Sequence, residues 1–90
     1  MEVFFKPTFI KEFNILPKGI KEEVKRLCLE NFSNLQNFKE LKNCDVKSIR
    51  GFNNYYRIRM GDYRIGFKAE DKAVIFMRVC HRKDIYRYFP

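Results

Sequence analysis

The sequence predicts an α+β fold in which an N-terminal strand and a helical hairpin pack on a mostly antiparallel four-stranded sheet. Three observations lead to it. Residues 2–6 form a short apolar run that ends before a proline, residues 8–36 carry apolar side chains at helical spacing, and from residue 47 the pattern changes to period-two alternation broken by turn residues. A sheet of this kind can bury one face under helices and leave the other to solvent.

Length and composition are those of one small folded domain. Ninety residues leave room for a single core, so we expect one domain over residues 1–90. Hydrophobic residues make up 46% of the chain and aromatic residues 17%, which is too apolar for a disordered tail. Any functional site must therefore be built on the faces and edges of this one core.

The N-terminal half predicts one strand and two helices. Residues 2–6 contain Val and two Phe and stop at Pro7, as a short strand does. Pro17 and Gly19 interrupt the helical spacing and predict a hairpin of two helices whose apolar stripes cover the sheet. The stripe residues are Phe9, Ile10, Phe13 and Leu16, then Ile20, Val24, Leu27, Cys28 and Leu35.

The C-terminal half predicts an antiparallel meander. The polar residues 36–47 are predicted to form a loop. Strands are predicted at 48–52, 55–60, 63–69 and 73–80, joined by short turns at 53–54, 61–62 and 70–72.

Alternation divides this meander into an apolar face and a cationic face. The apolar face, predicted to pack toward the helices, carries Tyr56, Ile58, Met60, Tyr63, Ile65, Phe67, Ile75, Met77 and Val79. The cationic face carries Arg57, Arg59, Arg64, Lys68 and Arg78 with no Asp or Glu among them. Because like charges opposite one another destabilise a sheet, and because Arg offers a planar fork of donors to phosphate, this face indicates a phosphate-bearing partner.

Net charge supports a polyanionic partner. The chain has a formal charge of +8, and residues 50–90 account for +6 of it, with ten basic and four acidic side chains. Nucleic acid, anionic lipid and an acidic protein all remain candidates at this point. No apolar run approaches the roughly 20 residues of a membrane helix, and the first residues lack the layout of a signal peptide, so we expect a soluble, cytoplasmic protein with no membrane partner.

Metal chemistry is disfavoured by the residue types present. Cys28, Cys44 and Cys80 are widely spaced and form no Cys-x-x-Cys pair, and His81 is the only histidine. We expect no metal and no other cofactor. Metal-free cleavage of RNA needs groups that move protons and groups that neutralise charge on the phosphate, roles suited to His or Tyr and to Arg respectively. Residues 80–90 supply both kinds, although a lone His at a strand end is more often a surface or capping residue.

Three motifs carry a family resemblance. They are Ile-Arg-Gly at 49–51, Tyr-Arg-Ile-Arg-Met-Gly-Asp-Tyr-Arg-Ile at 56–65 and Val-Cys-His-Arg-Lys-Asp-Ile-Tyr-Arg at 79–87. In this order they resemble the RelE/ParE superfamily of bacterial and archaeal toxins. The resemblance covers residues 48–88 by motif and residues 1–47 only through the strand and hairpin layout.

The resemblance implies a toxin of a type II toxin–antitoxin pair, inhibited by a small and largely extended antitoxin, which the charge predicts to be acidic. In the RelE branch the toxin enters the ribosomal A site and cuts mRNA without metal, leaving a cyclic phosphate or a 3′-phosphate. By position, Arg57 and Arg59 fall where that branch often has catalytic lysines. Arg64 falls at its phosphate-binding arginine, Arg82 at its transition-state arginine, and Tyr86 at the tyrosine near the attacking hydroxyl.

One departure from the family pattern affects the assignment of roles. An Arg side chain cannot be deprotonated in a protein, so Arg57 and Arg59 would stabilise charge rather than take a proton. The proton work then falls to His81, Tyr86 or the ribosome. We therefore expect catalytic roles for Arg64, Arg82, Tyr86 and His81, and RNA contacts from Arg57, Arg59, Lys68, Arg78 and Lys83. Two alternatives stay open: a non-enzymatic ParE-like poison of DNA gyrase, and an inactive nucleic-acid-binding module of the same fold.

Overall fold

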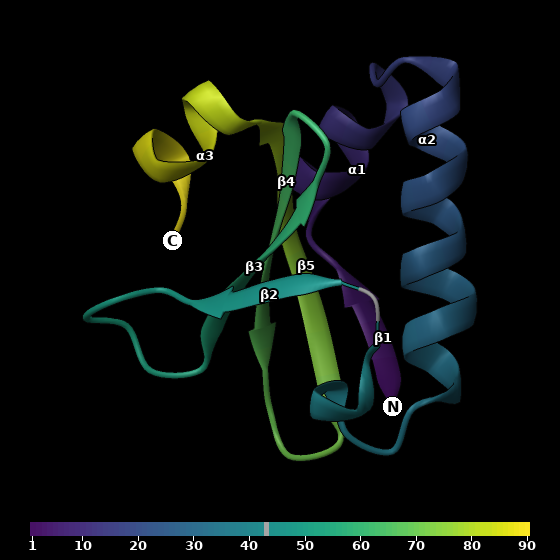
Figure 1. The fold of residues 1–90 in the computed structure, drawn as a ribbon, viewed down its shortest axis with the longest axis vertical. Coiled ribbons are helices and arrows are strands. Elements are labelled where there is room, and N and C mark those ends of the chain that lie inside the picture. The colour runs from purple at the N-terminus through teal and green to yellow at the C-terminus, as the bar shows by residue number, and fades with distance from the viewer. Residues whose placement is uncertain (43) are drawn as a thin grey trace.

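The computed structural model describes residues 1–42 and 44–90. Its centre is a five-stranded sheet in the order β1-β5-β4-β3-β2, with α1 and α2 on one side and α3 on the other (Figure 1). The strands are β1 (Glu2–Phe5), β2 (Asp45–Ser48), β3 (Tyr55–Met60), β4 (Tyr63–Ala69) and β5 (Ala73–His81). The helices are α1 (Pro7–Asn14), α2 (Lys18–Lys25) and α3 (Arg82–Tyr88). The predicted α+β class is confirmed.

The helical hairpin is confirmed, with its break at Pro17. Pro7 opens α1 at a position where a missing N–H costs no hydrogen bond. The second helix continues past α2 as a π-helical turn over Arg26–Asn31 and a 3₁₀ turn over Phe32–Asn34. Val24, Phe32 and Cys28 on this helix are fully buried against the sheet.

Phenylalanine rings dominate the core beneath the hairpin. Phe32 contacts Phe67 of β4 and Phe76 of β5 with ring centroids 5.4 and 5.0 Å apart, both edge to face. All three rings are fully buried. Burial of each such side chain contributes about 1.5–3 kcal/mol, and edge-to-face pairs add to that, so this triad fixes the hairpin on the sheet.

The region predicted as a loop at 36–47 contains a strand, which corrects the expected strand at 48–52. Strand β2 runs from Asp45 to Ser48 and pairs antiparallel with β3, placing Asp45 opposite Arg59. Residues 49–54 are needed for the connection, where Gly51 and Asn54 adopt positive φ angles of 86° and 70°. The sequence did not predict β2 because edge strands are commonly polar or charged, and a polar segment resembles a loop. With β1 joining parallel to β5, the sheet has five strands rather than four.

The predicted inward residues of the last strand are wrong in its first half. Val74 and Phe76 are fully buried, whereas Ile75 and Met77, expected to face the core, are partly exposed. The cause is an irregularity between Gly66 and Phe67, where Gly66 pairs with Arg78 but Phe67 pairs with Phe76. The extra residue on β5 reverses the alternation, as a bulge does, and Val79 beyond it faces the core as predicted.

The second face of the sheet is covered in part, not left to solvent. Helix α3, which no sequence pattern predicted, packs on β4 and β5 and buries Ile85 and Phe89. The ring of Phe89 lies over Gly66, where a Cβ atom would approach it to 2.8 Å. Gly66 therefore admits the C-terminal segment onto this face.

No helix within the described ranges has the length and apolar character needed to cross a membrane.

Candidate active site

Four arginines and one tyrosine meet between the sheet and α3. We call this set the arginine cluster: Arg57 and Arg59 of β3, Arg64 of β4, and Arg82 and Tyr86 of α3. Register explains the convergence, because Arg59 pairs directly with Arg64 and Arg57 pairs with Gly66, so all three arginines share one face. Helix α3 follows β5 at once and brings its own two residues to that face.

Arg57 is held by three contacts and is only 8% exposed. Its Nε donates to the hydroxyl oxygen of Tyr86 at 3.0 Å. Its Nη1 donates to the backbone oxygen of Asp45 at 3.4 Å and lies 3.6 Å from the Asp45 carboxylate oxygen Oδ1. The guanidinium is thus fixed between an edge strand and α3, while Tyr86 as a residue is 61% exposed.

Arg64 is a second buried charge of the cluster. Its Nη1 donates to the backbone oxygens of Gly61 and Tyr63 at 2.8 and 2.9 Å, and the residue is 9% exposed. Burial lowers the pKa of the Arg64 guanidinium below its ordinary value, and the charges of Arg57, Arg59 and Arg82 lower it further. These cations are close enough to repel one another, so a phosphate placed among them would relieve that repulsion.

Arg82 and Arg59 form the open rim of the arginine cluster. The backbone N–H of Arg82 donates to the backbone oxygen of Asp62 at 2.7 Å. The Nε atom of Arg82 lies 3.8 Å from the Asp62 carboxylate, and the Arg82 side chain is still exposed. Arg59 is exposed and, within the part of the chain that the structure describes, has no carboxylate within ion-pair distance. Both side chains can reach a ligand without breaking a buried contact.

His81 is not brought to the arginine cluster. It pairs with Tyr63 in the sheet, so it shares the face of Tyr63 rather than that of Arg64, and its ring lies edge to face with Tyr63 at 5.7 Å. Its Nδ1 accepts from the Lys83 backbone N–H at 3.2 Å and caps α3. The structure thus gives His81 the capping role that a strand-end histidine commonly has, and a proton-transfer role for it stays an untested prediction.

Three predicted RNA contacts lie outside the arginine cluster. Arg78 makes a two-pronged ion pair with Glu12 of α1, at 3.0 and 2.7 Å, and lies under the Tyr88 ring. Lys68 is 3.7 Å from Glu70 and 5.6 Å from the centre of the Tyr55 ring. Lys83 is exposed on the first turn of α3. The expected acid-free face is therefore partly neutralised by carboxylates from neighbouring elements.

Asp45 is the functional candidate that sequence reasoning missed. The polar residues 36–47 predict a loop, yet β2 brings Asp45 beside Arg57. Extending the period-two alternation back from Lys47 through Val46 to Asp45 would have placed it on the cationic face.

The described residues contain no convergent group of three His, Cys, Asp or Glu side chains. Burial raises the pKa of the Cys80 thiol to about 11 and also raises the pKa of the Cys28 and Cys44 thiols, which disfavours the reactive thiolate form. The arginine cluster itself offers permanent positive charge from its guanidiniums and one hydroxyl able to donate or accept a proton. This set is suited to binding phosphate and stabilising charge that develops on it.

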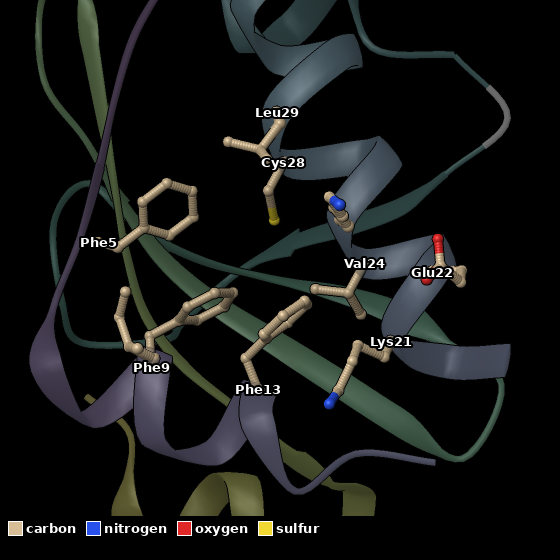
Figure 2. Close-up of a pocket in the computed structure, with 10 residues that line it drawn as sticks. Phe5, Phe9, Phe13, Lys21, Glu22, Val24, Cys28 and Leu29 are labelled. Atoms are coloured by element: carbon tan, nitrogen blue, oxygen red, sulfur yellow. The ribbon is translucent and has the colours of Figure 1, made fainter. Parts of the chain in front are cut away.

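A concave surface lies between α1 and α2, and we call it the helical groove. It has a volume of about 270 Å³. Figure 2 shows Phe5, Phe9 and Phe13 on one wall facing Val24 and Cys28 on the other, with Lys21 at the rim. Its lining is apolar, in contrast to the arginine cluster on the other side of the sheet.

Comparison with known proteins identifies the family. A model of the ParE toxin of the type II toxin–antitoxin system parDE matches residues 3–86. The chain is 46% identical over 90 residues to Toxin RelE3 of Methanocaldococcus jannaschii, covering 100% of both chains.

Two solved structures of toxin–antitoxin complexes share the fold of this chain. The toxin in the crystal structure of the RelB-RelE antitoxin–toxin complex from Methanococcus jannaschii superposes with a TM-score of 0.82 and 41% identity, covering 97% of this chain and 99% of that one. The RelBE2 toxin–antitoxin complex of Mycobacterium tuberculosis gives a TM-score of 0.69 and 25% identity, covering 90% and 96%. With the family model spanning most of the chain and a relative matched along its whole length, the protein belongs to the RelE/ParE family of toxins of type II toxin–antitoxin systems.

Proposed function

We propose that this toxin is a ribosome-dependent mRNA endoribonuclease that cuts without a metal ion. The observation that carries the proposal is that Arg57, Arg59, Arg82 and Tyr86 gather near Arg64, with Arg57 donating to the Tyr86 hydroxyl. A protein that only bound an acidic partner would have no need of a buried arginine aimed at a phenol. The similarity to a RelE toxin along the whole chain supports the same reaction.

In the proposed reaction the ribose 2′-OH attacks the adjacent phosphorus and the bond to the 5′-oxygen breaks. Arg64 and Arg82 stabilise the charge that develops on the phosphate, and Arg59 holds the RNA backbone. Tyr86 accepts a hydrogen bond from Arg57 Nε, so its own proton is free to be donated to the leaving 5′-oxygen. The 2′ proton passes to water or to a ribosomal group, and the product ends in a 2′,3′-cyclic phosphate.

The test uses programmed ribosomes with an mRNA that carries one 2′-deoxy nucleotide at the cut position. Cleavage of the all-ribose mRNA, a cyclic phosphate or 3′-phosphate end, and no cleavage at the deoxy position are expected. A 3′-hydroxyl product, or equal cleavage of the deoxy mRNA, would contradict 2′-OH attack. Naked mRNA should be cut far more slowly than ribosome-bound mRNA. This design leaves the magnesium that ribosomes need in place.

A second candidate function is a ParE-like gyrase poison, and the match of residues 3–86 to the ParE toxin model favours it. Such a toxin would inhibit supercoiling by purified gyrase and leave mRNA intact. Running the gyrase assay beside the ribosome assay separates the two functions.

We further infer that an acidic, RelB-like antitoxin inhibits this toxin. Two of the similar structures are complexes of a toxin with its antitoxin. The helical groove supplies an apolar anchor with lysines at its rim, and the net charge of +8 favours fast association with an acidic chain. The on-rate should fall as salt rises, because exposed charges are screened beyond about 8 Å at physiological ionic strength.

A further inference from the structure

Asp45 lies beside the arginine cluster without a role in the proposed reaction. Its carboxylate Oδ1 is 3.6 Å from Arg57 Nη1, and its backbone oxygen accepts from the same nitrogen at 3.4 Å. Among the described residues it is the only carboxylate within ion-pair distance of Arg57. A negative charge at this position opposes RNA binding, so we expect Asp45 to make a favourable contact within the site.

The favourable contact of Asp45 is with Arg57, whose side chain it orients. The guanidinium must direct Nε toward the Tyr86 hydroxyl, 3.0 Å away, although Arg64 and the other cations nearby repel it. Asp45 attracts the opposite edge of the guanidinium and so holds it in this rotamer. Because the side chain of Arg57 is 9% exposed and that of Asp45 is 43% exposed, the pair is only partly screened by solvent.

We propose that Asp45 is a positioning residue that fixes the hydroxyl of Tyr86 for proton donation by orienting Arg57. The proposal rests on the proposed nuclease function. It assigns Arg57 to the support of Tyr86 rather than to contact with RNA, since the buried guanidinium already has partners on two sides.

Rate and affinity should respond to Asp45 in opposite directions. Asp45→Asn keeps the backbone carbonyl and the side-chain shape but removes the negative charge. RNA affinity should stay equal or rise, because the site becomes more positive. The single-turnover cleavage rate on saturated ribosomes should fall about 5-fold, the upper value for a partly exposed ion pair.

The matched control is Asp71→Asn, which removes the same charge from the turn between β4 and β5. Arg57 pairs with Gly66, three residues before Ala69 at the end of β4, so this turn begins roughly 10 Å along the strand from the level of Arg57. Asp71→Asn should change neither the single-turnover rate nor the affinity by as much as Asp45→Asn does. An equal loss of rate in both variants would mean that net charge alone is responsible and would overturn the proposal.

A double-mutant cycle tests whether Asp45 acts through Arg57. In an Arg57→Ala background, Asp45→Asn should cause no further loss of rate, since the group that it orients is gone. Positioning through Arg57 would be refuted if the rate losses of the two single variants multiply in the double variant. It would also be refuted if Asp45→Asn leaves the rate unchanged, or if RNA affinity falls as much as the rate.

A readout without RNA keeps this proposal separate from the nuclease. The Nε–H of Arg57 gives an NMR signal whose exchange with water is slow while it donates to Tyr86. Exchange should accelerate in Asp45→Asn and in Tyr86→Phe, but not in Asp71→Asn. If the wild-type protein fails to cut mRNA but shows this pattern, the nuclease function fails and the orienting contact stands. If exchange in Asp45→Asn equals wild type, the orienting role is wrong whatever the activity.

Discussion

The arginine cluster and the helical groove are surfaces of this small toxin that differ in the interactions they offer a ligand. The groove between α1 and α2 is lined by phenyl rings and aliphatic side chains, so it suits a ligand that buries apolar area (Figure 2). The arginine cluster is built from permanent charges held by backbone carbonyls and carboxylates, so it suits a ligand of opposite charge. Because the sheet separates them, a substitution can disable one surface and leave the other intact.

Loss of Arg82 is expected to have the largest effect and to be confined to the arginine cluster. Its side chain is exposed, so Arg82→Ala should leave the fold unchanged. Removing one donor aimed at developing charge costs about 100- to 1000-fold in rate. The single-turnover cleavage rate should fall by this factor while antitoxin affinity changes little. Lys83→Ala is the neighbouring control, and a loss of ribosome affinity as large as the loss of rate would make Arg82 a docking contact only.

Adding a methyl group at Gly66 should damage the arginine cluster through packing. A Cβ there would lie 2.8 Å from the Phe89 ring, so Gly66→Ala must displace the segment that follows α3. Overpacking of this kind costs about 1–3 kcal/mol, which urea denaturation can measure. Gly19→Ala is the matched control, because no heavy atom lies within 4 Å of the new Cβ. Cleavage should fall in the Gly66 variant, while antitoxin binding at the groove should persist where the protein remains folded.

A charge placed in the helical groove should affect only antitoxin binding. Ile10 lines the groove and is 47% exposed, whereas Ile15 is 83% exposed and lies outside it. Ile10→Glu should weaken antitoxin binding about 10-fold, since part of the roughly 1.5–3 kcal/mol for burying an Ile is lost. Ile15→Glu, which adds the same charge, should change affinity little. Calorimetry at two salt concentrations checks this. Equal effects of both variants would show that the antitoxin responds to charge rather than to the groove.

Replacement of His81 should have the smallest effect. Its Nδ1 caps α3, and its place in the sheet is opposite Tyr63, on the other face from Arg64. His81→Gln should therefore change the cleavage rate by less than about 3-fold and cost roughly 1 kcal/mol of stability through the lost cap. A fall of about 100-fold or more, the scale of general acid–base catalysis, would restore His81 as the proton carrier and break the assignment to Tyr86.

The sequence predicted the elements with strong periodicity and missed those whose role depends on tertiary contacts. The hairpin interrupted at Pro17 and the alternation of β3 and β4 were readable, and with them the shared face of Arg57, Arg59 and Arg64. Strand β2 and helix α3 were not, because one is polar and the other has seven residues, too few to display a helical stripe.

The candidate site was likewise predicted only in part. The residues of the arginine cluster were named from strand parity and from the family motifs. Asp45, Glu12 and Asp62 were not, although they set which arginines are held by carboxylates. These carboxylates lie on β2, on α1 and in the turn between β3 and β4, whereas their cations lie on β3, β5 and α3. A single sequence does not show such neighbours, and the bulge at Met77 is equally invisible to a period-two pattern.

Glu12 also protects an open strand edge from association with other chains. Strand β1 pairs with β5 only as far as Phe76, so the rest of β5 would expose backbone N–H groups to a passing strand. Glu12 accepts from the Val79 N–H at 3.0 Å and at the same time holds Arg78. One helical carboxylate thus takes the place of a missing strand, and it lets a highly charged toxin end its sheet without inviting edge-to-edge aggregation.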